Sequence, residues 1–220
     1  MKIVSPVEQM SGECLLFLAG WGMDPIPFSD LAAPKSDLIF CYDYQEIDIG
    51  SLHNLSTQYE KIHLIAWSMG VWVGAHLFSK VPNFLASATA VNGTLSPIDE
   101  RCGLSKTAYR AMLDNFSSTA LNGFYDEMFS KQSERERFSD HCPRRSPRNI
   151  HRELEILYEQ FLHHGPALDI YDRKIVGTQD RIFSARNQAR AWGRGNCEIL
   201  PVAHFPFYTW NGLIEHTEFK

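Results

Sequence analysis

Continuous apolar runs recur along the first part of the chain and define its predicted architecture. Four of them have the length of single strands, at residues 13–20, 38–44, 62–67 and 85–93. Because they are mostly apolar, we expect strands that are buried on both faces. Helical segments lie between them, at residues 27–32 and 71–78. This alternation predicts an α/β protein with a mostly parallel sheet and helices on both faces.

No strand is predicted between residue 94 and two late apolar runs, at residues 174–180 and 197–201, which again predict strands. The stretch between contains only loops and helical patterns, at residues 109–116, 124–129 and 150–161. We therefore expect a core of residues 1–94 and 169–220, with residues 95–168 as an inserted helical cap over the carboxyl edge of the sheet. A large crossover without a role in ligand binding is the alternative. A closing helix is expected from Phe205 onward.

Charge and cysteine usage narrow the class of protein. The 220-residue chain carries a net charge of −5, which disfavours nucleic acid as a partner. Five scattered cysteines without a C-x-x-C motif indicate reduced thiols in the cytoplasm and no zinc site. No apolar run approaches the roughly 20 residues of a membrane span, so we expect no membrane contact.

Ser68 stands between a predicted strand and a predicted helix, with small residues two positions away on either side. These are Ala66 and Gly70, and a sharp strand-to-helix turn requires small side chains there. Such a turn exposes the serine hydroxyl beside a helix N-terminus, where N–H groups stabilise negative charge. The pattern indicates a nucleophilic serine. A serine in a tight turn without chemistry is the alternative.

A serine nucleophile needs a base, and the base needs a carboxylate that orients it. Asp180 ends one late predicted strand, and His204 follows the next. Both therefore belong to the sheet edge at which Ser68 emerges. The order Ser, Asp, His is also that of hydrolases with this type of turn. We predict a Ser68–His204–Asp180 triad, although Asp180 could instead cap a helix and His204 could be an ordinary surface histidine.

Two main-chain N–H groups are expected to stabilise the oxyanion of an acyl-transfer reaction. One belongs to the residue after the nucleophile, here Met69, and the other to the loop after the first buried strand, here Trp21. Gly20 and Gly22 give that loop the conformational freedom it needs. An ordinary strand-end turn is the alternative. This chemistry requires neither a cofactor nor a metal ion.

Four segments resemble one enzyme family. Residues 17–24 are similar to the oxyanion strand of the biotin-synthesis carboxylesterases, and residues 66–70 to their Trp-Ser turn. Residues 177–182 and 203–207 resemble their acid and histidine segments. Given its short length, the chain most resembles the BioG-type pimeloyl-acyl-carrier-protein methyl ester esterases.

The resemblance implies an α/β-hydrolase fold and hydrolysis of the methyl ester of a pimeloyl chain on acyl carrier protein, a step of biotin synthesis. It implies Ser68 as nucleophile, His204 as base and Asp180 as the acid that orients the base. Two residues depart from the superfamily pattern. Ala19 stands where many relatives carry His, and Ala66 replaces the first Gly of the turn. Both could reshape the pocket, but neither removes a reacting group.

The predicted cap contains a basic segment. Residues 131–152 include seven basic and three acidic residues, a net +4 within a chain of −5. Arginine suits carboxylates and phosphates, so an acidic partner is expected. The resemblance identifies this partner as acyl carrier protein, and a solvated surface of mixed charge is the alternative. The candidate docking residues are Arg135, Arg137, Arg144, Arg145, Arg148 and Arg152.

Phe124 and Met128 lie one helical turn apart in the predicted cap and are candidates for the lining of an acyl channel. Ordinary packing against the sheet is the alternative. Two other functions remain open. Another serine hydrolase, such as an acyl thioesterase or a small-ester esterase, would have the same triad. A non-catalytic ligand-binding module would not need all three triad residues.

Overall fold

One seven-stranded sheet forms the centre of the computed structural model, which describes residues 1–7, 12–31, 36–81 and 83–209. The strand order is β1-β3-β2-β4-β5-β6-β7. Only β1 runs antiparallel to its neighbour, and the other five pairs are parallel. The strands are β1 Lys2–Val7, β2 Glu13–Leu18, β3 Asp37–Tyr42, β4 Lys61–Trp67, β5 Ser87–Val91, β6 Arg173–Gln179 and β7 Glu198–Ala203.

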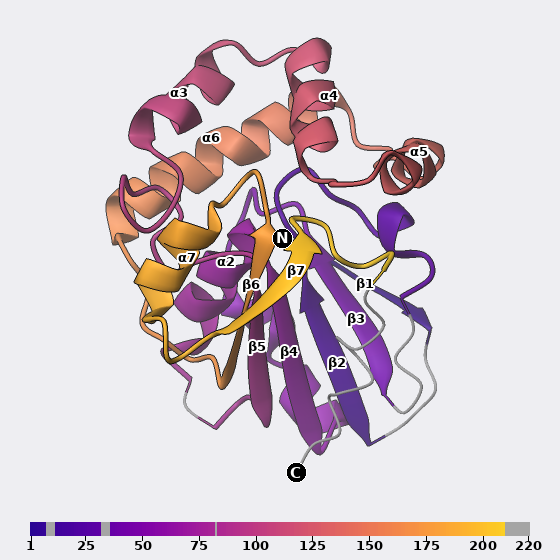
Figure 1. Cartoon of the computed structure of the whole chain (residues 1–220). Helices are drawn as coiled ribbons and strands as arrows, with labels where there is room; N and C mark the ends of the chain where they lie inside the picture. Colours follow the sequence, from indigo (N-terminus) through magenta and orange to yellow (C-terminus); the bar gives the residue numbers. More distant parts are fainter. Residues whose placement is uncertain (8–11, 32–35, 82, 210–220) are drawn as a thin grey trace.

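Helices connect the strands, and a helical insert follows β5. The insert lies above the end of the sheet at which β6 and β7 finish (Figure 1). The connecting helices are η1 Ile26–Phe28, η2 Ile49–Leu52, α1 Leu55–Gln58, α2 Met69–Phe78 and α7 Ala185–Trp192. The insert contains α3 Lys106–Asp114, α4 Ser118–Glu127, α5 Gln132–Asp140 and α6 Pro147–His164. The predicted α/β architecture with a helical insert is confirmed.

The sequence pattern did not predict five elements, namely β1, η2, α1, α5 and α7. β1 was missed because Ser5 and Pro6 interrupt it, and an edge strand tolerates such residues since only one side pairs. α5 was missed because its sequence has no apolar stripe, and only Glu134 and Phe138 are buried in it. α7 was missed for the same reason, since its largest buried side chains are Gln188 and Trp192.

Two predicted helices differ in the structure. The segment predicted as a helix over 27–32 forms only the 3-10 turn η1, and Ala32 lies outside the described residues. The closing helix is wrong over residues 205–209, which form a loop and a turn. Residues 210–220 lie outside the described part of the chain. Pro206 explains the difference, because it follows Phe205 directly and disfavours a helical conformation there.

An aromatic cluster underlies the carboxyl end of the sheet. Neighbouring rings in it have centroids 5.0 to 5.9 Å apart. Burying each such ring contributes about 1.5–3 kcal/mol. The cluster joins β2, β3 and β4 to η1 and to the loop after β7, and thereby anchors that loop. Its members are Phe17, Phe28, Phe40, Trp67, Phe205 and Phe207.

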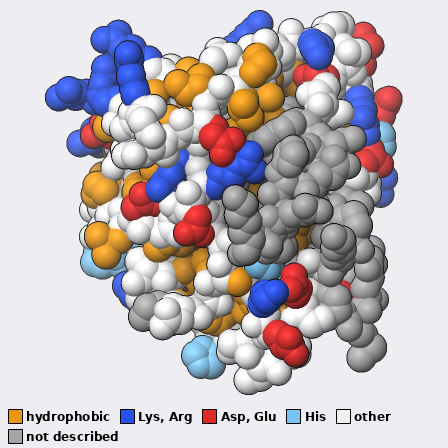
Figure 2. Space-filling view, turned by 60° about the horizontal axis from the view of Figure 1, so that its bottom comes forward, with side chains coloured by type: hydrophobic (Ala, Val, Ile, Leu, Met, Phe, Trp, Pro, Cys, Tyr) orange, Lys and Arg blue, Asp and Glu red, His pale blue; other side chains and the backbone are white. Residues whose placement is uncertain are grey.

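The outer surface has mixed character. Figure 2 shows hydrophobic side chains scattered among charged side chains of both signs on the face that it presents. Within the described ranges, no helix is both long enough and apolar enough to cross a membrane. All five cysteines lie within the described residues and are free thiols.

Candidate active site

Ser68 occupies a strained turn between β4 and α2. Its φ of 57° and ψ of −125° are rare for a residue with a side chain and cost on the order of 1–3 kcal/mol. Only Gly fits at position 70, because an added Cβ would lie 2.5 Å from the main-chain oxygen of Leu18. Ala66 is buried between Leu18 and Ala90 in the sheet. The turn therefore accommodates a methyl group at its first small position.

The three predicted triad residues meet at the carboxyl edge of the sheet. His204 Nε2 lies 3.1 Å from Ser68 Oγ, and His204 Nδ1 lies 2.9 Å from Asp180 Oδ2. All three residues are buried, with exposed fractions of 4% for Ser68, 7% for Asp180 and 0% for His204. They follow β4, β6 and β7, whose parallel ends bring them to one edge. This is the hydrogen-bonded row that a serine nucleophile, its base and the base's orienting acid require.

The Asp180 carboxylate is fixed by four hydrogen bonds. Oδ1 accepts from the main-chain N–H groups of Ile182 and Phe183, each at 2.8 Å. Oδ2 accepts from Gln188 Nε2 at 3.0 Å and forms the fourth hydrogen bond with His204 Nδ1. The side chain does not cap α7, because Ser184 does so. The alternative of a helix-capping aspartate is therefore wrong.

His204 is held from its main chain and from its ring. Its carbonyl oxygen accepts from Trp67 Nε1 at 2.7 Å and from Asn92 Nδ2 at 3.0 Å, and the Phe183 ring stacks against the imidazole. Asn92 Oδ1 also accepts from Gly177 N, so this amide joins the ends of β5, β6 and β7. The surface-histidine alternative is wrong. Asn92 was not identified from the sequence as a residue of the site, although an Asn-Gly pair at the end of a strand indicates a turn.

The predicted oxyanion groups lie beside the serine. We call residues 20–24 the oxyanion loop. A Cβ added to Gly20 would lie 3.0 Å from Ser68 Cβ and 2.9 Å from the Trp67 ring, so the loop approaches the serine closely. No residue in the described ranges accepts a hydrogen bond from the main-chain N–H of Trp21 or Met69. Within the described residues, both N–H groups are therefore unpaired, and their role as oxyanion donors stays a prediction.

Phe124 and Met128 both lie next to this site. The Phe124 ring meets the Trp21 ring edge to face at 4.9 Å. Met128 is completely buried, and its carbonyl oxygen accepts from Phe205 N at 3.0 Å. Their contacts place α4 against both the oxyanion loop and the histidine segment. A role for the two residues in an acyl channel stays a prediction.

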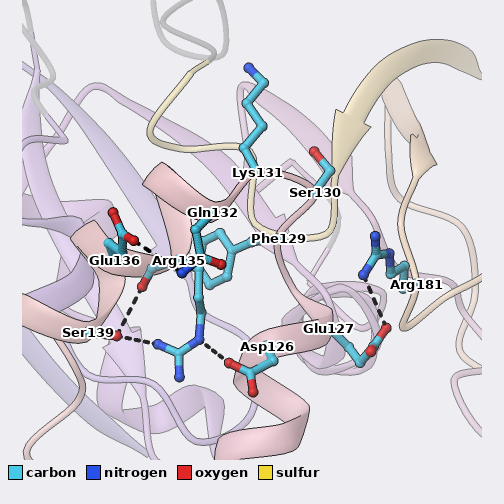
Figure 3. A pocket seen from close by; sticks show the side chains of 10 residues that line it. All are labelled: Asp126, Glu127, Phe129, Ser130, Lys131, Gln132, Arg135, Glu136, Ser139 and Arg181. Atoms are coloured by element: carbon cyan, nitrogen blue, oxygen red, sulfur yellow. Dashed lines mark hydrogen bonds and ion pairs between the residues drawn. The ribbon is translucent and has the colours of Figure 1, made fainter.

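A polar groove borders the site. It has a volume of about 670 Å³ and lies between α4, α5 and the loop after β6 (Figure 3). Its lining includes Arg135, which pairs with Asp126, and Arg181, which lies 3.8 Å from Glu127. No triad residue lines the groove, but Arg181 directly follows Asp180. The groove is therefore a polar surface that reaches the residue next to the triad acid.

The arginines of the basic segment fall into three groups. Arg135 and Arg137 pair with Asp126 and Asp30, and Arg152 pairs with Glu155 at 3.0 Å. Arg144 and Arg148 are exposed, and their side chains form no ion pair with a described acid, although the main-chain N–H of Arg144 donates to Asp24 Oδ2 at 2.7 Å. Arg145 forms the third group, because its side chain is enclosed by the protein.

The structure shows that the prediction of Arg145 as a docking residue is wrong. Its side chain is only 5% exposed, and it pairs with Asp43 at 2.8 Å and with Glu153 at 2.7 Å. The pKa of Asp43 is lowered, because hydrogen bonds from Gln45 and Lys2 and the charge of Arg145 outweigh the effect of burial. A buried and fully paired guanidinium cannot meet a partner protein. Arg145 instead ties the insert to the end of β3.

Comparison with solved structures identifies the class of protein. A lipase-esterase related protein from Clostridium acetobutylicum superposes with a TM-score of 0.65 at 15% identity, covering 98% of this chain and 97% of that one. At this identity the likeness concerns the fold alone. The elbow serine, the strand order and the helical insert define an α/β-hydrolase fold, and the protein belongs to the class of α/β-hydrolase-fold proteins.

Sequence comparison identifies the family. The family profile described as pimeloyl-ACP methyl esterase BioG matches residues 3–213, and the chain belongs to this family. The crystal structure of BioG from Haemophilus influenzae is similar, with a TM-score of 0.84 and 30% identity over 94% of this chain and 95% of that one. A malonyl-[acyl-carrier protein] O-methyltransferase from Bacteroides fragilis is 36% identical over 187 residues. The match covers 85% of this chain but only 38% of the length of that relative.

Proposed function

We propose that this protein hydrolyses the methyl ester of a pimeloyl chain carried on acyl carrier protein. The observation that carries the proposal is the row of hydrogen bonds from Ser68 through His204 to Asp180 in a member of the BioG family. Esters that are hydrolysed at an activated serine react through an acyl-enzyme. The product would be a free carboxylate at the far end of the carried chain.

The proposed reaction begins at Ser68. Its Oγ attacks the ester carbonyl carbon while His204 Nε2 takes the hydroxyl proton. Negative charge then develops on the carbonyl oxygen, where the N–H groups of Trp21 and Met69 donate hydrogen bonds. Collapse breaks the bond to the methoxy oxygen, and His204 returns the proton so that methanol leaves. Water, deprotonated by His204, hydrolyses the acyl-enzyme by the same two steps.

The relative from Bacteroides fragilis supports a carrier-bound methyl ester as substrate. Its name describes the transfer of a methyl group to a malonyl unit on acyl carrier protein. Such a transfer creates a methyl ester on a carried acyl chain. An esterase that resembles part of that protein fits the removal of the same group after the chain has been extended.

The carrier is proposed to dock through Arg144 and Arg148. These two side chains are exposed near the start of α6, and no described acid neutralises them. Arg135, Arg137 and Arg152 already have acidic partners, so they contribute less free positive charge. An acidic carrier would be steered to unpaired guanidinium groups.

The reaction is tested by mass spectrometry of carrier protein that bears a methyl pimeloyl thioester. We expect wild-type protein to remove one methylene mass and leave the acyl chain on the carrier, and we expect Ser68→Ala to leave the substrate intact. Release of the whole acyl chain would instead indicate a thioesterase. Turnover of a small chromogenic ester but not of the carrier substrate would indicate a small-ester esterase. Equal activity in Ser68→Ala would overturn the assignment of the serine.

The docking surface is tested with Arg144→Glu combined with Arg148→Glu. We expect kcat/KM for the carrier substrate to fall about tenfold, which corresponds to about 1.4 kcal/mol, and to become less sensitive to salt. The small ester should be hydrolysed at the wild-type rate. Arg186→Glu with Arg194→Glu is the matched control, because it makes the same charge change on and just after α7, far from the start of α6 (Figure 1). Equal losses in both double variants would contradict a specific docking site.

A further inference from the structure

We propose that Glu153 of α6 is a positioning residue, which holds the oxyanion loop so that the Trp21 N–H faces the oxygen that becomes negatively charged. The inference rests on the proposed function and extends it to a side chain of the helical insert. Glu153 is not part of the triad and does not reach Ser68. Its effect on the reaction would pass through the main chain of the loop.

Glu153 is completely buried and makes contacts that only a carboxylate can make together. Oε2 accepts a hydrogen bond from Gly22 N at 3.0 Å, and Oε1 accepts one from Tyr44 N at 2.8 Å. Arg145 Nη1 donates to Oε2 at 2.7 Å. Burial raises the pKa of Glu153, while Arg145 and the two N–H donors favour its ionised form. One side chain of α6 thus binds the oxyanion loop and the chain after β3 simultaneously.

Arg145 completes the arrangement from the other side. Its Nη1 also donates to the carbonyl oxygen of Met23 at 3.1 Å, and its Nη2 donates to Asp43 at 2.8 Å. Its Nε donates to Asn149 Oδ1 at 2.7 Å. The guanidinium therefore pairs with two carboxylates and holds a second point of the oxyanion loop. Without it, the buried carboxylate of Glu153 would be strongly destabilising.

The contacts hold the chain directly after the N–H group that the reaction is proposed to use. Because a peptide unit is planar, the bond from Gly22 N to Glu153 fixes the unit that joins Trp21 to Gly22, which is the neighbour of the unit that carries the Trp21 N–H. The Trp21 side chain is fixed separately, since its Nε1 donates to the carbonyl oxygen of Ile150 at 2.8 Å. Ile150 and Glu153 are three residues apart and so lie on one face of α6. Gly22 has a φ of 79°, which glycine adopts readily. Because glycine is also the most flexible residue, the loop depends on these contacts to stay in place.

A loosened loop would affect the transition state more than the bound substrate. The oxyanion forms only after attack, so a displaced donor removes stabilisation mainly at that point. The expected signature is a lower kcat with a nearly unchanged KM. A purely structural role would lower the thermal stability without this split.

The test uses Glu153→Gln in the full chain with a small chromogenic ester. The amide keeps the shape of the side chain but offers one acceptor oxygen to three donors. We expect kcat to fall about 100-fold, as when one oxyanion donor is lost, with KM within about threefold of wild type. A trifluoromethyl ketone, which forms a hemiketal oxyanion with a serine, should bind more weakly by the same factor as the fall in kcat/KM.

Tyr109→Phe is the matched control. Tyr109 is buried, and its hydroxyl donates to the carbonyl oxygen of Leu154, the residue after Glu153, at 3.1 Å. The change removes a buried hydrogen bond to α6 without touching the oxyanion loop. We expect a lower melting temperature with a wild-type kcat. A comparable loss of kcat in this control would overturn the inference.

Other outcomes separate this inference from the proposed function. A folded Glu153→Gln variant with wild-type kcat and inhibitor affinity would overturn only the role of Glu153. Absence of Ser68-dependent hydrolysis in the wild-type protein would overturn the proposed function as well. If Glu153→Gln does not fold, Glu153→Asp replaces it. That variant keeps the charge but is one methylene shorter, so the same selective loss of kcat is expected, and an unchanged kcat would again refute the role.

Discussion

Replacing Asp180 with Asn should disable His204 by forcing the wrong tautomer. Asp180 Oδ1 accepts from two main-chain N–H groups, so the oxygen of the new amide should remain there. The NH₂ group then takes the place of Oδ2 and donates to His204 Nδ1. The ring must carry its proton on Nε2, which faces Ser68 and can no longer accept a proton from it.

The surroundings of Oδ2 determine how much this orientation costs. The new NH₂ group would face the NH₂ group of Gln188, which now donates to Oδ2 at 3.0 Å and to the carbonyl oxygen of Phe183 at 2.6 Å. Turning the Gln188 amide over would place its oxygen against that carbonyl. The reversed orientation of the new amide is worse, because its NH₂ group would oppose two main-chain N–H groups. We expect destabilisation of about 1–3 kcal/mol from unpaired buried donors.

The expected loss of activity is large. Forcing this tautomer at a triad histidine lowers kcat by about 10⁴-fold, or about 5.5 kcal/mol at 1.36 kcal/mol per factor of ten. Steady-state hydrolysis of a small chromogenic ester measures the loss, and ¹⁵N NMR of His204 reports the tautomer. Adding Gln188→Ala should recover part of the stability of Asp180→Asn but none of its activity. More than a tenth of wild-type kcat/KM, or a proton on Nδ1 in the variant, would refute the reasoning.

Three further predictions concern the elbow and the far end of its helix. Ser68→Ala and His204→Ala should each lower kcat by about 10⁶-fold, and the double variant should lose little more, whereas multiplied losses would show that the two residues act independently. Gly93→Ala should lower both the melting temperature and kcat, because the new Cβ would lie 2.4 Å from the Ser68 carbonyl oxygen; a wild-type melting curve contradicts this. Burial, together with His164, lowers the pKa of His76 to about 4. The unfolded chain, with an ordinary histidine pKa, therefore binds more protons between about pH 6.5 and 4, and stability falls as the pH drops through that range. Calorimetry should show a smaller fall for His76→Gln, and identical pH profiles would refute the shift.

Local sequence carried enough information for the centre of the fold and the triad. Central parallel strands are buried on both faces, so their apolar runs stand out without any knowledge of neighbours. The elbow could be recognised because a sharp turn excludes bulk at Ala66 and Gly70. Asp180 and His204 could be placed because the carboxyl ends of parallel strands share one edge of the sheet.

Elements that bury few side chains were harder to predict. β1 pairs on one side only, and α5 buries just two of its nine residues. Neither therefore needs a marked hydrophobic pattern. The sequence shows that Arg145 is charged but not which residues surround it. Because Arg145 lies in a segment rich in arginine, an exposed docking role was the simplest interpretation.

What only the tertiary structure decided is the set of polar partners that hold the site in place. Glu153 meets Gly22 across 131 positions, Asn92 meets His204 across 112, and Arg145 meets Asp43 across 102. The sequence specifies a residue's charge and its hydrogen-bonding groups, and it also contains the proposed reacting groups of Ser68, Asp180 and His204. The burial of a side chain, and the partner that makes its burial tolerable, depend on which distant segments pack against it. No local pattern records that, because the free energy of a buried polar group is set by its partners in space.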